Sequence, residues 1–100
     1  MSGPTPDALR EALRDVFDPE LGYNIVDLGL IYDIAIENAR ATITMTMTTP
    51  GCPAADVIRN GVLERANKVA GLTEVAVDVV WDPPWSPDCM SPPAKAHFGV

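Results

Sequence analysis

The chain has 100 residues, of which 47% are apolar, and its formal net charge is −7. A chain of this length is expected to form one domain, residues 1–100, which can bury roughly 60–70% of its unfolded surface without disulfides or metals. Its acidic surface would repel phosphate backbones and anionic lipid head groups. The composition therefore disfavours binding to nucleic acids and to membrane surfaces.

The cysteine content and the first residues indicate the compartment. Two cysteines, Cys52 and Cys89, are too few for the disulfide frameworks of small secreted domains. The start of the chain lacks the basic and apolar segments of a signal peptide, and no apolar run reaches the roughly 18–20 residues of a membrane span. These features predict a cytoplasmic protein.

The acidic residues are unevenly distributed. Between Asp15 and Glu37 there are six acids and no Lys, Arg or His. Charge runs are usually solvated surfaces that aid solubility, and that is the simpler interpretation here. The alternative is a face that meets a basic partner.

The first predicted element is a helix. Thr5 is a candidate N-cap, Pro6 suits the first helical position, and Asp7 falls in the first turn, where acids are favoured. An apolar stripe with helical spacing follows, made of Leu9, Ala12, Leu13, Val16 and Phe17. Asp18-Pro19 is expected to end the helix, because the residue before proline disfavours helical geometry.

Residues 18–29 are predicted to form a loop with tight backbone points at Gly22 and Gly29. Within it, Asp27 lies between two apolar residues and is expected to be partly buried. A buried carboxylate must accept hydrogen bonds from backbone N–H groups or side-chain donors, or it costs about 1–3 kcal/mol. The simplest role for Asp27 is structural, as a loop cap that accepts backbone N–H bonds.

Two alternating segments predict an antiparallel hairpin with a short connection over residues 37–40, in which Asn38 can adopt a positive φ. The core-facing residues are expected to be Leu30, Tyr32, Ile34, Ile36, Ala41, Ile43, Met45 and Met47. The opposite face of the second strand carries Thr42, Thr44, Thr46 and Thr48, which are compatible with solvent.

The segment Thr48-Thr49-Pro50-Gly51-Cys52-Pro53 joins the second strand to a helix predicted over residues 53–70. Proline after Cys52 makes this cysteine a candidate N-cap, where the helix dipole would lower the pKa of its thiol modestly. Nearby acids such as Asp56 oppose that effect. A mildly activated thiol is one interpretation, and a buried cysteine that packs as a small apolar residue is the other.

A third strand is predicted over residues 75–82, returned to the same sheet by the preceding helix. Residues 82–93 contain five of the ten prolines and cannot form a central strand. Within them, Trp85 either packs back on the sheet or is an exposed anchor for a partner. One helical turn is expected over residues 94–98.

The order helix, strand, strand, helix, strand predicts an α+β fold. We expect a two-layer sandwich in which the helices cover one face of a mostly antiparallel sheet, followed by a proline-rich C-terminal tail.

Catalytic templates are mostly missing from the sequence. It has no glycine-rich phosphate loop, and the single histidine, His97, is expected at the surface near the C-terminus. We therefore expect no enzymatic turnover. Cys52 and Cys89 could approach each other and hold a metal or a transient iron–sulfur species, but clusters usually need four thiolates. A dimer or a client protein would have to supply the rest.

Several motifs occur in one order along most of the chain. They are Asp18-Pro19-Glu20, the segment 24–32, Thr48-Thr49-Pro50-Gly51-Cys52-Pro53, the segment 82–87 and Met90-Ser91. Together they resemble the SufT/PaaD-type metal–sulfur cluster biosynthesis family, and the chain looks like a SufT-like member.

The resemblance implies a factor that aids the delivery of iron–sulfur clusters to client proteins, without turnover of a small substrate and without a stably bound cofactor. It makes Cys52 the candidate reactive or cluster-contacting thiol. Family members often carry a bulky apolar residue near Cys89, so a partnership of Cys52 and Cys89 as transient cluster ligands would be special to this chain. The signature loops carry Asp18, Glu20, Asp27 and Thr49. Partners would be other assembly proteins and client apoproteins, and a homodimer is left open.

Three alternative functions stay open. The first is a small thiol-redox protein that uses Cys52 and Cys89. The second is an accessory protein of an aromatic-degradation oxygenase, as in PaaD-like members, and the third is an adaptor whose acidic loop docks a basic partner. Pro92-Pro93, which replaces residues typical of the family, also puts a C-terminal helix in doubt.

Overall fold

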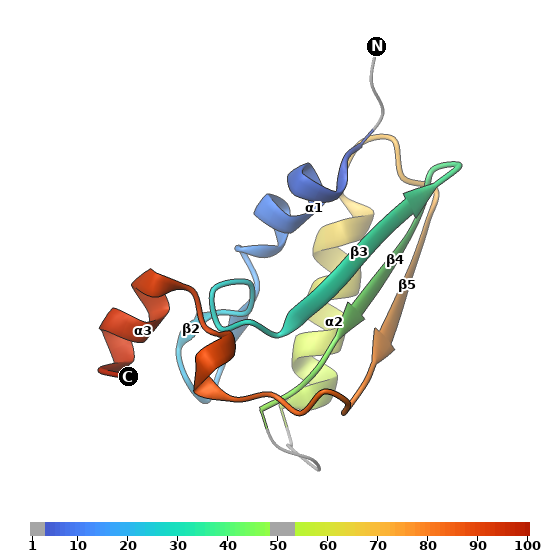
Figure 1. Cartoon of the computed structure of the whole chain (residues 1–100). Coiled ribbons are helices and arrows are strands. Elements are labelled where there is room, and N and C mark those ends of the chain that lie inside the picture. The colour runs from blue at the N-terminus through green and yellow to red at the C-terminus, as the bar shows by residue number, and fades with distance from the viewer. Residues whose placement is uncertain (1–3, 49–53) are drawn as a thin grey trace.

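The structure is a computed structural model that describes residues 4–48 and 54–100. Its elements in chain order are α1 (Pro6–Leu13), β1 (Phe17–Asp18), β2 (Tyr23–Asn24), β3 (Ile31–Glu37), β4 (Arg40–Met45), α2 (Ala55–Asn67), β5 (Glu74–Val79), the 3-10 helix η1 (Pro87–Cys89) and α3 (Pro92–Phe98). Figure 1 shows α1 and α2 on one side of the sheet formed by β3, β4 and β5, with α3 near β2.

The sheet has the order β3-β4-β5, and β1 and β2 form a separate pair. β3 and β4 are antiparallel, as are β1 and β2, whereas β4 and β5 are parallel. Parallel neighbours need a crossover connection, and α2 supplies it. The predicted α+β sandwich with two layers is therefore confirmed, and its sheet is mixed.

One hydrophobic cluster holds the layers together. Its fully buried members come from α1, α2, α3, β4 and the loop between β2 and β3: Leu9, Leu13, Ile25, Leu28, Leu30, Ile43, Met45, Ile58, Val62, Ala66 and Ala94. Met45 and Met47 fill this core as predicted. Within the described ranges, no helix is long and apolar enough to cross a membrane.

The first helix begins as predicted but ends early. The Thr5 hydroxyl accepts a hydrogen bond from the Ala8 backbone N–H at 3.1 Å, and the helix stops at Leu13 rather than at residue 17. Phe17 pairs with Asn24 between β1 and β2, and its side chain is 55% exposed. Its predicted place in the apolar stripe is therefore wrong, because residue 17 is in a strand.

The β3–β4 hairpin forms as predicted, with a two-residue connection between Glu37 and Arg40, but its strands do not alternate strictly. A bulge lies between Ile31 and Asp33, so Ile31 and Ile34 are both buried while Tyr32 is only partly buried. A bulge redirects the side chains on either side of it. The Tyr32 hydroxyl binds the carbonyl of Pro83 in the tail, so the prediction that Tyr32 faces the core is wrong.

The hairpin connection contains two residues at positive φ, Asn38 at 52° and Ala39 at 64°. Alanine is strained by about 1–2 kcal/mol there, whereas glycine is not, although glycine costs about 0.4–1 kcal/mol through the unfolded chain. We expect Ala39→Gly to stabilise the fold by about 0.5–1 kcal/mol, measured by urea unfolding. A destabilised variant would contradict this backbone description.

The second helix is shorter than predicted. It starts at Ala55, and Ala54 is the N-cap residue without a side-chain hydrogen bond. The prediction that Cys52 is the N-cap is therefore wrong. The dipole argument for an activated thiol loses its premise, and Cys52 itself lies outside the described residues.

The tail forms a helix longer than the single turn predicted. Ser91 is its N-cap, and the Ser91 hydroxyl accepts a hydrogen bond from the Ala94 N–H at 3.4 Å. Prolines are tolerated in the first turn, where the N–H groups lack partners within the helix, so Pro92 and Pro93 do not prevent α3. Gly99 ends the helix in the left-handed conformation, at φ 73°.

Candidate functional site

The centre of the site is the carboxylate of Asp27, in the loop between β2 and β3. Its side chain is 11% exposed. Arg14, the C-cap residue of α1, and Asn24 each donate a hydrogen bond to Asp27 Oδ2, at 2.7 Å and 2.8 Å. The Asn24 side chain in turn accepts the Asp27 backbone N–H at 2.8 Å. Asp27 is thus buried as predicted, but side chains rather than backbone groups satisfy its carboxylate.

The protonation of Asp27 follows from these contacts. Burial by itself would raise the pKa of the carboxyl group. Hydrogen bonds from Asn24, Ser91 and Arg14, together with the positive charge of Arg14, outweigh burial and hold the pKa of Asp27 below its ordinary value. Asp27 is therefore a charged connection between α1, its own loop and the tail.

The tail is fastened by three hydrogen bonds, two to the same loop and one to β3. The Trp85 indole N–H donates to the Leu28 carbonyl at 2.7 Å, and the Ser91 N–H donates to the Asp27 carbonyl at 2.8 Å. The Tyr32 hydroxyl donates to the Pro83 carbonyl at 2.8 Å. Trp85 is half-buried, so it packs back on the protein as one of the two predictions had it, with its indole bound to the loop before β3.

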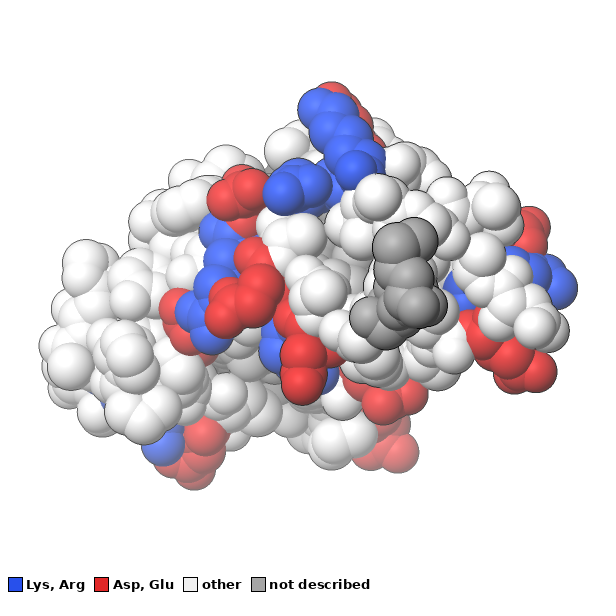
Figure 2. Space-filling model, turned by 90° about the horizontal axis from the view of Figure 1, so that it is seen from above, with Lys and Arg blue, Asp and Glu red and all other residues white. Residues whose placement is uncertain are grey.

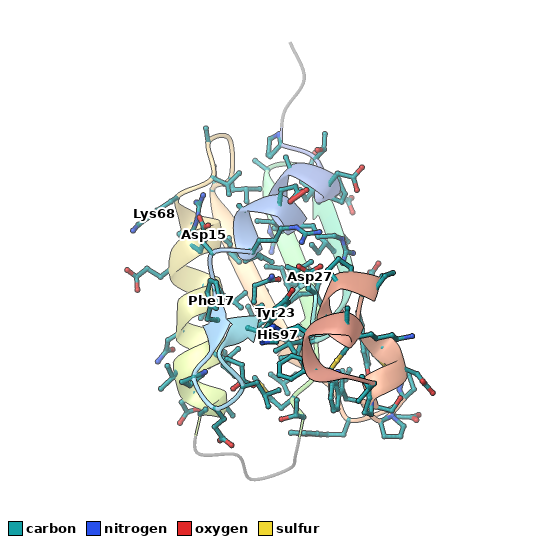
Figure 3. All side chains as sticks on the ribbon, turned by 90° about the vertical axis from the view of Figure 1, so that its left-hand side faces the viewer. Asp15, Phe17, Tyr23, Asp27, Lys68 and His97 are labelled. Carbon is teal, nitrogen blue, oxygen red and sulfur yellow. The ribbon has the colours of Figure 1, made fainter. Side chains whose placement is uncertain are left out.

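The C-terminal helix adds an aromatic contact. Figure 3 shows Tyr23 beside His97, and their ring centroids are 4.9 Å apart. Phe98 completes the group, with its ring centroid 5.6 Å from that of Tyr23. His97 is exposed, as predicted, and its ring also contacts its neighbours in this group.

The first signature loop has a structural explanation. The carboxylate of Asp18 is buried and accepts the backbone N–H groups of Glu20 at 2.8 Å and Leu21 at 3.2 Å. A carboxylate that binds its own loop in this way fixes a turn. Asp18 therefore shapes the β1–β2 connection, while the Glu20 side chain is exposed.

Cys89 is a free, exposed cysteine at the end of η1. Its backbone lies against Gly29, because a Cβ atom added to Gly29 would be 2.2 Å from the Cys89 carbonyl oxygen. Burial raises the pKa of the neighbouring Tyr32 phenol, and the electrostatic and hydrogen-bonding interactions with Cys89 raise it further. The Thr46 hydroxyl acts on the same phenol in the opposite direction.

Thr46 departs from the expectation for its strand. Thr42 is exposed as predicted, but Thr46 is fully buried, since Tyr32 and the tail lie at its end of the sheet. Among the described residues, its hydroxyl makes no hydrogen bond of acceptable geometry, although the Tyr32 phenol is near. Such a group costs about 1–3 kcal/mol and is unusual in a folded protein.

Two sequence-predicted site residues, Cys52 and Thr49, lie outside the described residues. A Cys52–Cys89 partnership therefore stays a prediction. In the ranges that the structure describes, no group of three or more His, Cys, Asp or Glu side chains is arranged to hold a metal ion. The described residues alone therefore offer no ready-made metal site, and a cluster would need further ligands from outside these ranges.

Many of the basic side chains are neutralised by neighbours. Four of the seven Lys and Arg residues form ion pairs, including Arg65 with Asp15 at 2.9 Å. Figure 2 shows several blue side chains next to red ones on the face seen from above.

A groove of about 320 Å³ lies beside the Asp15–Arg65 pair, flanked by the exposed side chains of Phe17 and Val57.

Sequence reasoning missed three members of the site: Arg14, Tyr32 and Thr46. Arg14 lies within the span of the predicted apolar stripe, but α1 ends before it, and as the C-cap residue it pairs with Asp27. The positions of Tyr32 and Thr46 depend on the bulge in β3 and on the tail, neither of which has a signal in the alternating pattern.

Comparison with known proteins finds matches over most of the chain. Residues 6–79 match the profile of a family described as "Iron-sulfur cluster assembly protein". The "Fe-S protein maturation auxiliary factor YitW" of Bacillus subtilis is 42% identical over 94% of this chain and 97% of its own length. The "Fe-S protein maturation auxiliary factor SufT" of Staphylococcus aureus is 40% identical over 85% of this chain and 98% of its own length.

The fold also matches a solved structure. The crystal structure of the domain of unknown function DUF59 from Bacillus anthracis has a TM-score of 0.89 and 47% sequence identity, over 95% of this chain and 92% of that one. At this identity the two chains share the arrangement of helices and strands described above.

Proposed function

Because the chain belongs to the iron–sulfur cluster assembly protein family, we propose that it is a maturation factor that aids the delivery of iron–sulfur clusters to client proteins. The observation that carries this proposal is similarity over nearly the whole length of two relatives named maturation auxiliary factors. Their names concern the same activity that the motifs of this sequence indicate.

The cluster is cargo in this proposal rather than a resident cofactor. The described residues present one free cysteine, Cys89, and iron–sulfur clusters usually need four thiolates. A cluster in transit would therefore take further thiolates from Cys52, from a client or from another assembly protein. Cys52 is the thiol that we assign to contact with the cargo, and client apoproteins and assembly proteins are the partners.

The chain works by contact rather than by turnover in this proposal. Its fixed tail, its charged Asp27 connection and its exposed apolar side chains suit a protein that presents a surface to others. We place this activity in the cytoplasm, where thiols are kept reduced.

Deleting the gene for this protein in its own cells tests the proposal. We expect the specific activity of a cluster-dependent dehydratase to fall while the amount of its polypeptide stays the same, because the client is made but not matured. Activity and bound iron per client molecule are the measurements. An enzyme of the same metabolic pathway that needs no cluster is the control, and an unchanged dehydratase activity would contradict the proposal.

A further inference from the structure

The strand β5 lies at one edge of the sheet. Because the strand order is β3-β4-β5, β5 pairs with β4 on one side, and Figure 1 shows it as the outermost strand. Within the described residues, no strand pairs with its other side. A free strand edge is a row of backbone N–H and C=O groups that can pair with another chain.

The hydrogen bonds at the two ends of β5 show which of its residues face the free edge. The Val80 N–H donates to the Met45 carbonyl at 2.8 Å, and the Glu74 N–H donates to the Ala39 carbonyl at 3.4 Å, both on the side of β4. Backbone groups alternate from side to side along a strand. The intervening residues that direct their backbone groups away from β4 are therefore Val75, Val77 and Val79.

The other edge of the sheet is interrupted, whereas the β5 edge is regular. β3 contains the bulge between Ile31 and Asp33, and a bulge is one way in which proteins block pairing at an edge. β5 keeps one register with β4 from Glu74 to Val79 and contains no proline. Of the two edges, β5 is therefore the one suited to receive a further strand.

The two faces of β5 select the chemistry of an added strand. On one face the side chains of the three valines pack against the core but are only partly buried. On the other face Glu74 and Asp78 are exposed. Arg40 pairs with Glu74, and among the described residues no ion pair includes Asp78. An added strand is therefore stabilised when apolar side chains cover the valines and a basic side chain lies next to Asp78.

We propose that the β5 edge binds an extended segment of a partner protein in which apolar and basic residues alternate. The segment adds a fourth strand, with its backbone paired to the three valines of β5. A second copy of this chain fits the edge less well, because a sheet continued through two β5 strands brings the acids of both copies together on one face. The partner is defined by the chemistry of the edge and not by a cluster, so the inference does not rest on the proposed function.

A synthetic peptide of alternating valine and lysine tests the proposal on the native chain. Hydrogen exchange of the Val75, Val77 and Val79 amides is followed by NMR. With the peptide at about ten times its Kd, we expect exchange of these amides to slow about tenfold, because only the free protein exchanges them. The same peptide methylated at every backbone amide keeps its charge but cannot pair with a strand, and we expect it to leave exchange unchanged.

Two matched variants test the selection by charge. Asp78→Lys reverses the acid at the β5 edge. Asp33→Lys makes the same charge change on β3, in the same row of the sheet, since both residues pair with Thr44. We expect Asp78→Lys to weaken binding of the valine–lysine peptide about fivefold. Asp33 is two strands, or about 10 Å, away, where salt at about 0.15 M screens most of its effect, so Asp33→Lys should weaken binding less than about twofold.

Three results would overturn the proposal: unchanged exchange at the valine amides with the peptide, equal slowing by the methylated peptide, or equal losses in the two variants. Slow exchange of these amides in the free protein, together with the mass of a dimer, would overturn it as well, because a second copy would then occupy the edge.

Discussion

Gly29→Ala is expected to destabilise the protein by about 2–5 kcal/mol and to release the tail from the loop. Gly29 has a φ of +82°, where alanine is strained, and the added Cβ would lie 2.2 Å from the carbonyl oxygen of Cys89. The obstacle is backbone rather than a flexible side chain, so the tail must move. Urea unfolding measures the loss, and faster alkylation of Cys89 reports release of the tail.

Gly22→Ala is the matched control for this prediction. Gly22 also has a positive φ, +68°, but nothing lies within 4 Å of the position of its added Cβ. Gly22→Ala should therefore lower the free energy of unfolding only through conformational strain, by about 1–2 kcal/mol. Equal losses for the two variants would show that contact between Gly29 and Cys89 does not matter.

Asp27→Asn is expected to cost about 2–4 kcal/mol, because it removes a charge from a buried network and leaves Arg14 with only its exposed pair to Glu11. Arg14 is 42% exposed in its side chain, which places the effect below that of a fully buried pair. Asp15→Asn is the control. The Asp15 side chain is 68% exposed in its pair with Arg65, so this substitution should lower the free energy of unfolding by only about 0–1 kcal/mol. Similar losses at both positions would contradict the network.

The same network predicts that the stability of the fold depends on pH. The pKa of Asp27 in the folded protein is lower than in the unfolded chain, where it is about 3.9. Its stabilisation is therefore complete above that value and is lost as the pH falls through the folded pKa. Urea unfolding between pH 6 and pH 2, measured at about one-unit steps, gives the free energy of unfolding. As the pH falls, this free energy should decrease less in Asp27→Asn than in the native chain.

The alternating and helical patterns predicted the layers because each pattern reports burial on one side of an element. The stripe of α1 located the helix that covers the sheet, and the run in β4 located its core face with Met45 and Met47. The crossover rule returned the third strand to the same sheet, and the pairing of β5 with β4 confirms it. These features depend on near neighbours in the sequence.

The site depended on contacts between distant segments, and its prediction from sequence was weaker. Asp27 could be identified as a buried acid in need of donors, but Arg14 reaches it from a helix that ends four residues earlier than the stripe suggested. A bulge turned Tyr32 away from the core and toward the tail, and Thr46 is buried although its strand face was expected to meet solvent. Neither event is encoded in a short periodic pattern.

The most direct test of the central claim, that this chain matures iron–sulfur clients through Cys52, is the Cys52→Ser variant in cells that lack the native chain. We expect the variant to accumulate and unfold like the native protein but to leave the activity of the cluster-dependent dehydratase near the level found without the chain. Cys89→Ser, made in parallel, separates the two thiols. Full dehydratase activity in cells that contain only Cys52→Ser would contradict the claim.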